Sequence, residues 1–197
     1  MNFRNSLAPI LLAGALSTGL ASAQEIYKSE ASVQAFGSFT ATTWNQGVKQ
    51  NATDAGGVLA SYRYFFNNYN GIELNYGFAS GTQKYNYFGS VAATPANSDE
   101  ATAAWIIRYP GHRVVPFGLL GTGALVFNPQ NIGFETLQAR AAFVYGGGID
   151  VGLGNHYFMR AEYRGFVYDS PDFDSPFLGP DRTTHRAEPS IGFGVKW

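Results

Sequence analysis

Residues 157–168 read YFMRAEYRGFVY, and they alternate strictly between two kinds of side chain. The odd-numbered positions from Tyr157 to Val167 hold apolar, aromatic or small residues, whereas the even-numbered positions include Arg160, Glu162 and Arg164. A period of two is typical of a β-strand whose two faces meet different surroundings. The stretch therefore predicts a strand with one apolar face and one face that carries three charges in succession.

The same alternation recurs along the chain and predicts an all-β fold of eight strands. Short connectors rich in turn-forming residues alternate with longer ones, which predicts an antiparallel up-and-down arrangement. The strands are expected near residues 30–44, 56–66, 71–84, 99–109, 114–127, 141–152, 157–169 and 186–197. The short connectors lie at 67–70, 110–113 and 153–156, and the long ones at 45–55, 85–98, 128–140 and 170–185.

Composition narrows the class of protein. Only 14% of the 197 residues are charged, 16% are aromatic, and there are 24 glycines. Globular domains average about 25% charged residues and about 7% glycine, so this chain is poor in charge and rich in glycine. It has no cysteine, which excludes a disulfide scaffold, and its formal net charge of −1 argues against a nucleic-acid partner.

The first 23 residues resemble an export signal. Arg4 precedes an apolar stretch from Leu7 to Leu20, and Ala21-Ser22-Ala23 fits a small-residue cleavage site. We therefore predict a signal peptide at 1–23 and one mature domain at 24–197. Beyond Ala23 no run approaches the ~18 apolar residues that a spanning helix needs. If the mature chain enters a membrane, it is expected to do so as strands.

Which face points inward decides between a membrane barrel and a soluble one. In water the apolar face would line the interior, and the protein would be a soluble periplasmic barrel carrying an apolar ligand. In lipid the apolar face would point outward and the charged face would line the interior. Aromatic residues crowd the apolar face near the strand ends, as they do at a bilayer interface. They are Tyr62, Tyr64, Phe66, Tyr76, Trp105, Tyr109, Tyr157 and Trp197. We therefore predict an eight-stranded antiparallel up-and-down transmembrane β-barrel.

The charged face predicts an ion-pair network inside such a barrel. Eight strands enclose just enough space for their own side chains, and an isolated charge in that space would be costly. The expected network comprises Arg63, Glu73, Arg108, Asp150, Arg160, Glu162, Arg164 and Glu188, and Arg186 and Lys196 lie on the same face. Such pairs can simply hold the barrel closed. Alternatively, pairs that exchange partners can gate a narrow pore for water or small ions.

Two motifs resemble bacterial outer-membrane barrels. The chain ends in SIGFGVKW, in which Ser190, Gly192, Val195 and Trp197 are similar to the C-terminal signal recognised by the barrel assembly machinery. Residues 160–164, RAEYR, and 146–153, GGGIDVGL, resemble the OmpA-like and opacity-type porin family.

This resemblance implies an integral outer-membrane protein surrounded by membrane lipids and lipopolysaccharide. It implies a structural, surface-exposed role in envelope integrity or adhesion, with an extracellular ligand at the long loops. The larger OmpA proteins carry a peptidoglycan-gripping domain after the barrel, and that role is not expected here because the chain stops at the last strand.

Catalysis is not expected, although some outer-membrane barrels are enzymes. His112 and His156 fall in short turns, and only His185 lies in a long connector, near Thr183 and Glu188. No nucleophile elbow or metal-ligand spacing accompanies it. The acidic loop 170–181 does not match a calcium-loop template. We therefore predict no enzymatic activity, no metal site and no cofactor.

Overall fold

A computed structural model describes the backbone of residues 27–41, 43–45, 48–52, 55–87, 90–129, 138–169 and 183–197. The predicted signal peptide at 1–23 lies outside these residues. The strands are β1 (Ser29–Thr40), β2 (Thr43–Asn45), β3 (Val48–Ala52), β4 (Ala55–Phe65), β5 (Asn70–Tyr87), β6 (Ser90–Arg108), β7 (Val114–Pro129), β8 (Gln138–Gly152), β9 (Tyr157–Asp169) and β10 (Thr183–Lys196).

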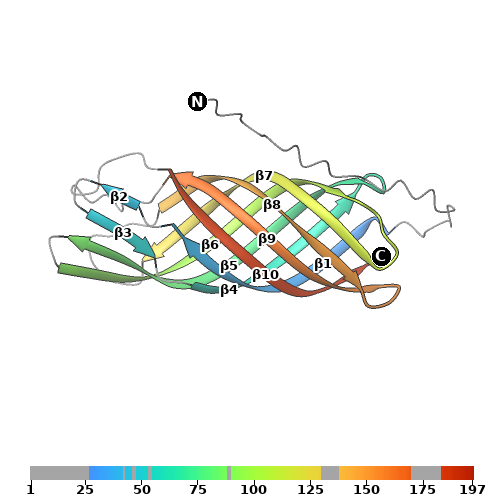
Figure 1. Cartoon of the computed structure of the whole chain (residues 1–197), viewed down its shortest axis with the longest axis horizontal. Helices are drawn as coiled ribbons and strands as arrows, with labels where there is room; N and C mark the ends of the chain where they lie inside the picture. Colours follow the sequence, from blue (N-terminus) through green and yellow to red (C-terminus); the bar gives the residue numbers. More distant parts are fainter. Residues whose placement is uncertain are drawn as a thin grey trace, which may run out of the picture.

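Eight of these strands close into an antiparallel barrel, as the alternation predicts (Figure 1). The hydrogen-bonded order runs from β5 through β4, β1, β10, β9, β8 and β7 to β6, and β6 pairs again with β5. Closure leaves no free edge in the barrel wall, which is the condition for backbone to lie in lipid. In the described part of the chain, no helix is long and apolar enough to cross a membrane.

The two ends of the barrel differ. One end, called here the turn end, carries the short turns at 66–69, 109–113 and 153–156. The described chain also begins and finishes there, where the Ser29 amide donates to the Trp197 carbonyl at 3.0 Å. The opposite end is called the loop end, and β3 and the β5–β6 hairpin extend there (Figure 1).

Part of the loop end is strand where the sequence predicted loop. The predicted connector 85–98 is largely a continuation of the β5–β6 hairpin, which pairs as far as Tyr87 with Ser90. The predicted connector 45–55 contains β3, whose Lys49 pairs with Asn86 of β5. These segments lie beyond the barrel wall and lack the apolar–polar alternation that the membrane imposes, so period-two analysis missed them. The other long connectors fall mostly on 130–137 and 170–182, outside the described residues.

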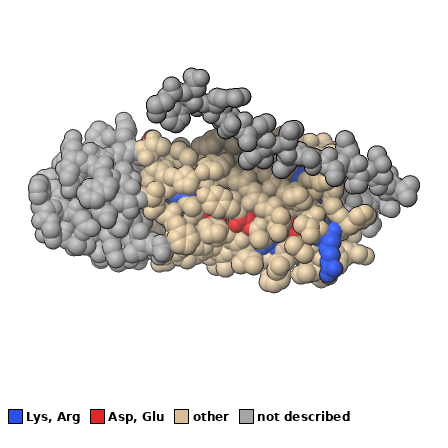
Figure 2. Space-filling model, in the orientation of Figure 1, with Lys and Arg blue, Asp and Glu red and all other residues tan. Residues whose placement is uncertain are grey.

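The apolar face of the wall points outward. Val33 is 60% exposed and Phe193 65%, whereas Arg63 is 1% exposed and Glu73 is fully buried. Figure 2 shows few charged atoms on the visible part of the described wall. An apolar exterior around a charged interior is the arrangement that lipid requires. The alternative of a soluble carrier, which needs the apolar face inside, is therefore wrong.

Aromatic rings form two groups on the outer surface near the turn end. Tyr62 lies 6.4 Å from Trp197, and Phe66 lies 5.8 Å from Tyr64 and 5.7 Å from Trp105, measured between ring centroids. Aromatic side chains with polar tips are favoured where a bilayer meets water. These groups have the composition and place of an interfacial girdle.

The seam between the first and last barrel strands is interrupted. The β1–β10 register runs from Glu30 opposite Lys196 to Phe36 opposite Ser190, and resumes only at Phe39 opposite Ala187. Pro189 lies in the gap, and proline has no amide hydrogen to donate to a ladder. The wall is therefore closed by two stretches of pairing along this seam.

Candidate functional site

The barrel interior collects the charged side chains because alternate residues of every strand point inward. All eight residues of the predicted network lie there, seven of them buried and Arg108 partly buried. The interior also holds three charged residues that the predicted network did not include, namely Glu30, Glu100 and Arg186. Arg186 lies on the inward face that the alternation predicts, whereas Glu30 and Glu100 lie at the edges of their predicted strands.

Arg160 organises the part of the network nearer the turn end. Its Nε donates to Asp150 Oδ1 at 2.7 Å, and its Nη2 donates to Asp150 Oδ2 at 2.8 Å. The same Nη2 reaches Glu30 Oε2 at 3.1 Å, and Nη1 donates to Ser32 Oγ at 3.2 Å. A guanidinium paired on both edges is the geometry in which arginine binds carboxylates most strongly.

Arg63 and Arg108 extend this group across the barrel. Arg63 donates to Glu73, to Glu162 Oε2 at 3.2 Å and to Asp150 Oδ2 at 3.3 Å. Arg108 Nη1 donates to Glu30 Oε1 at 2.7 Å. We call the set the turn-end cluster. It comprises Glu30, Arg63, Glu73, Arg108, Asp150, Arg160 and Glu162.

A second group lies farther toward the loop end and comprises Glu100, Arg164, Arg186 and Glu188. Arg164 Nη2 donates to Glu100 Oε1 at 2.6 Å and to Glu188 Oε2 at 2.8 Å. Arg186 pairs with the same two carboxylates. Gly77 makes room for this group, since a Cβ there would lie 2.5 Å from Glu100 Oε1. We call the set the loop-end cluster.

A single contact joins the two clusters. Arg164 Nε lies 3.8 Å from Glu162 Oε1, and both atoms are buried without a hydrogen-bond partner. Arg164 Nη1 and Arg186 Nε are also buried and unpartnered. The ion pairs therefore run from Arg108 to Arg186 with one weak step between Glu162 and Arg164.

Phenylalanine rings accompany the guanidinium groups. The Arg63 guanidinium lies 4.0 Å from the ring centroid of Phe117, and that of Arg108 lies 3.5 Å from Phe65. Arg164 and Arg186 share the ring of Phe166, at 5.3 and 5.7 Å. Cation–π contacts of this kind stabilise desolvated arginines by about 0.5–2 kcal/mol. The rings also fill the space that would otherwise admit water.

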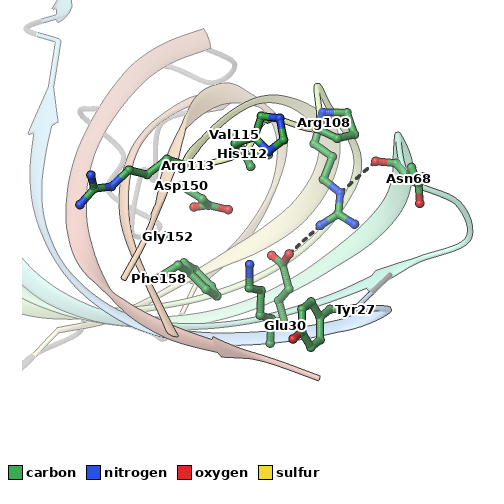
Figure 3. Close-up of a pocket in the computed structure, with 13 residues that line it drawn as sticks. Tyr27, Glu30, Asn68, Arg108, His112, Arg113, Val115, Asp150, Gly152 and Phe158 are labelled. Carbon is green, nitrogen blue, oxygen red and sulfur yellow. Dashed lines mark hydrogen bonds and ion pairs between the residues drawn. The ribbon is translucent and has the colours of Figure 1, made fainter. Parts of the chain in front are cut away.

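A small cavity opens the interior at the turn end (Figure 3). It has a volume of about 90 Å³. Arg108, Glu30 and Asp150 line its inner part, and His112 lies at its rim. We call it the mouth pocket. It places the outermost pair of the turn-end cluster, Arg108 and Glu30, within reach of the aqueous phase.

The residues of the predicted assembly signal fall on both faces of β10. Ser190 points inward and donates to Gln34 Oε1 at 2.9 Å, and Gly192 is buried beside it. Val195 and Trp197 point outward, and Trp197 belongs to the aromatic girdle. Recognition of this signal by the assembly machinery stays a prediction.

His185 lies on the outward face of β10, the same face as Thr183. Its Nε2 lies 2.7 Å from the Tyr145 hydroxyl. Thr184 and Glu188 are buried on the inward face of β10, opposite the face that carries His185. Among the described residues, no three His, Cys, Asp or Glu side chains are grouped so that they could hold a metal ion.

Comparison with known proteins identifies the family. The profile described as "Outer membrane protein beta-barrel domain" matches residues 10–195. The chain belongs to this family of outer-membrane β-barrels. The match begins inside the stretch predicted to be a signal peptide, so cleavage after Ala23 stays a prediction. No curated protein matches the sequence.

Solved structures of this barrel type share the fold at low sequence identity. OprG from Pseudomonas aeruginosa is 15% identical, with a TM-score of 0.64, and covers 88% of this chain and 98% of its own. Neisserial surface protein A is 12% identical, with a TM-score of 0.63 and coverages of 86% and 97%. Ail, the attachment invasion locus protein of Yersinia pestis, is 18% identical, with a TM-score of 0.51 and coverages of 86% and 99%.

Proposed function

We propose that this barrel is a closed scaffold that holds an interaction surface outside the cell and thereby contributes to adhesion or envelope integrity. The observation that carries the proposal is the interior, where ion pairs and phenylalanine rings run from Arg108 to Arg186. An eight-stranded barrel filled in this way lacks the open channel of a porin. Outer-membrane barrels turn their short connectors to the periplasm and their longer ones outward. The loop end is accordingly the external surface, and lipid and lipopolysaccharide surround the wall.

The backbone at the loop end supports an interaction role. β2, β3 and the ends of β5 and β6 form a hydrogen-bonded extension beyond the barrel. Binding residues are commonly presented on connectors that a rigid scaffold positions. The sequence of the extension is rich in amide and aromatic residues, including Trp44, Tyr85 and Tyr87. These residue types suit uncharged sugars or protein surfaces.

Charge argues against a polyanionic ligand. Ail was solved in complex with the heparin analogue sucrose octasulfate. In this chain the predicted connectors 45–55, 85–98, 128–140 and 170–185 contain three basic residues, Lys49, Arg140 and Arg182, and five acidic ones, Asp54, Glu135, Asp172, Asp174 and Asp181. An acidic excess repels sulfated polymers, so we expect a neutral glycan or a protein as the partner.

Adhesion is tested by displaying the full chain on cells that otherwise do not adhere. We expect binding to immobilised neutral glycans or host-cell protein extracts, and no binding to heparin-coated beads. Substituting both Tyr85→Ser and Tyr87→Ser should reduce binding, whereas Tyr69→Ser, in a short turn at the opposite end, should not. If cells that display the native chain adhere no better than cells that display the variants, and resist detergent equally well, neither adhesion nor envelope integrity is supported.

A narrow gated pore is the second candidate, and the joint between the clusters favours it. Glu162 Oε1 and Arg164 Nε have no hydrogen-bond partner and face each other at 3.8 Å, so this step of the ladder is the one most easily separated. We expect the native chain in planar bilayers to show no conductance or rare small openings, and Glu162→Gln to open more often. Ser80→Ala, on the outward face of β5, is the control. Large, steady conductance of the native chain would contradict both candidates.

We further propose that the chain is not an enzyme. The His185 ring contacts the Tyr145 hydroxyl, and the Glu188 carboxylate lies on the opposite, inward face of β10, which supports this. Hydrolysis of ester- or amide-linked lipid A acyl chains by outer membranes that carry the chain, lost on His185→Gln, would contradict it.

A further inference from the structure

The mouth pocket contains carboxylates that are already occupied. Both oxygens of Glu30 accept hydrogen bonds, from Arg108 and from Arg160. Both oxygens of Asp150 accept hydrogen bonds from Arg160, and one also accepts from Arg63. These acidic groups therefore have little capacity left for a ligand, and they neutralise charge behind the pocket rather than at its opening.

The basic groups at the pocket are less occupied. Arg108 uses Nη1 for Glu30 and Nε for the Asn68 carbonyl at 3.0 Å, which leaves Nη2 without a partner among the described residues. The Lys196 ammonium lies 5.2 Å from the Tyr27 ring and pairs with no carboxylate of the described chain. His112 is exposed at the rim (Figure 3) and carries no side-chain hydrogen bond within those residues. Donors thus exceed acceptors at this opening.

The surface around the pocket is also positively charged. The short turns at 66–69, 109–113 and 153–156 contain no Asp or Glu. Lys28 and Arg113, which lines the pocket, are exposed cations at this end, and Lys196 is half-buried. A low-dielectric rim that carries several positive charges attracts anions from solution.

We propose that the mouth pocket binds a phosphate group from the periplasmic side. Its unpaired donors come from three separate elements, namely Arg108 on β6, His112 in the following turn and Lys196 on β10. Donors placed on several elements around one opening suit a tetrahedral anion better than a planar carboxylate. Arginine and lysine are the side chains that most often bind phosphate oxygens, one through a planar fork and the other as a point charge. The volume of about 90 Å³ has room for one such group.

The phosphate can belong to a free anion or to the headgroup of a phospholipid in the periplasmic leaflet. Binding recruits Nη2 of Arg108 while Nη1 stays on Glu30, so the ligand is added to the end of the ion-pair ladder without breaking it. Phosphate binding at this pocket requires neither adhesion nor conduction by the barrel.

The test is a titration of the refolded mature chain in lipid nanodiscs with inorganic phosphate, followed by NMR or calorimetry at constant ionic strength. We expect saturable binding that Lys196→Gln weakens by about tenfold or more, the loss expected for one charge-assisted contact. His112→Gln should weaken it less. Lys28→Gln is the matched control, because Lys28 lies at the same end but does not line the pocket. An unchanged mobility shift on heating verifies that each variant is folded.

Two arms distinguish the source of the phosphate. In nanodiscs of zwitterionic lipid alone, binding of inorganic phosphate indicates a site for the free anion. If phosphatidylglycerol in the nanodisc competes with inorganic phosphate, the site also takes a lipid headgroup. The proposal is overturned if chloride at equal ionic strength produces the same response, if Lys28→Gln weakens binding as much as Lys196→Gln, or if no phosphate binding is measured.

Discussion

The two ion-pair clusters are both built from arginines and carboxylates, but they differ in how many of their hydrogen-bonding groups have partners. In the turn-end cluster, Arg160 makes four hydrogen bonds, and its partners Asp150 and Glu30 are satisfied at both oxygens. In the loop-end cluster, Arg164 reaches its two carboxylates through Nη2 alone, while Nε and Nη1 are buried without partners. A saturated buried network is rigid and stabilising, and an incompletely satisfied one is costly. Burial alone therefore does not measure what a charged group contributes.

The clusters also differ in redundancy. Glu100 and Glu188 each have two arginine partners, Arg164 and Arg186. Asp150 depends mainly on Arg160, because its contact with Arg63 is longer, at 3.3 Å. Removing one arginine should consequently leave a larger uncompensated charge near the turn end than near the loop end.

The largest effect is expected for Arg160→Met. The substitution removes three of the hydrogen bonds to Asp150 and Glu30, and breaking a buried pair on one side typically costs about 3–5 kcal/mol. Urea unfolding in lipid vesicles, followed by tryptophan fluorescence, measures the change. Arg160→Lys retains the charge and should lose less. A loss below about 1 kcal/mol would show that Asp150 and Glu30 find other partners.

A smaller loss is expected for Arg164→Met. Arg186 remains to neutralise Glu100 and Glu188, and the substitution also removes two unpartnered buried donors. The cost should approach that of an unsatisfied buried acceptor, about 1–3 kcal/mol. The same unfolding assay applies, with Arg186→Met as the matched variant. Equal losses for Arg164→Met and Arg160→Met would remove the distinction between the clusters.

The coupling between the clusters should be smaller still. Arg160 and Arg186 share no carboxylate, so the double variant Arg160→Met with Arg186→Met should lose the sum of the single losses within about 0.5 kcal/mol. A double-mutant cycle in the same assay measures the difference. A coupling free energy above about 1 kcal/mol would mean that the contact of Glu162 with Arg164 links the two clusters more strongly than its 3.8 Å separation suggests.

Salt should have the smallest effect. Raising KCl from about 0.1 to about 1 M shortens the screening length from about 10 to about 3 Å in water, but buried pairs are screened much less than exposed ones. The free energy of unfolding should therefore change little and by the same amount in the native chain and in Arg164→Met. A marked loss confined to the native chain would indicate that salt ions reach the loop-end cluster.

Much of the barrel could be predicted from sequence because the membrane imposes a regular pattern. Every strand that crosses lipid must alternate, and the even-numbered charges of 157–168 therefore predicted the inward face. Glu30 and Glu100 were missed for a simple reason, since both lie at the edge of a predicted strand, where alternation had too few residues to count. Their partners come from other strands far apart in the chain, which no local pattern encodes.

The loop end could not be predicted in the same way. The β5–β6 pairing from 81 to 96 covers residues that show no period-two alternation of apolar and polar types, so the sequence predicted no strand for most of it. The cation–π contacts could not be predicted either, because Phe117 and Phe65 resemble ordinary apolar residues until another strand places an arginine over each ring. Register and closure, rather than composition, decide these features.

Pro189 gives the barrel wall a weak point whose consequence is mechanical. A closed barrel wall resists force evenly only if every pair of neighbouring strands is equally well hydrogen-bonded. The β1–β10 pair is hydrogen-bonded in two stretches with a gap between them. Under a pulling force, or in spontaneous opening fluctuations, β1 and β10 would be the first neighbouring strands to separate. When the chain is pulled out of the membrane, the short stretch of β1–β10 pairing at Phe39 and Ala187 should therefore break first. The longer stretch toward the turn end should break last.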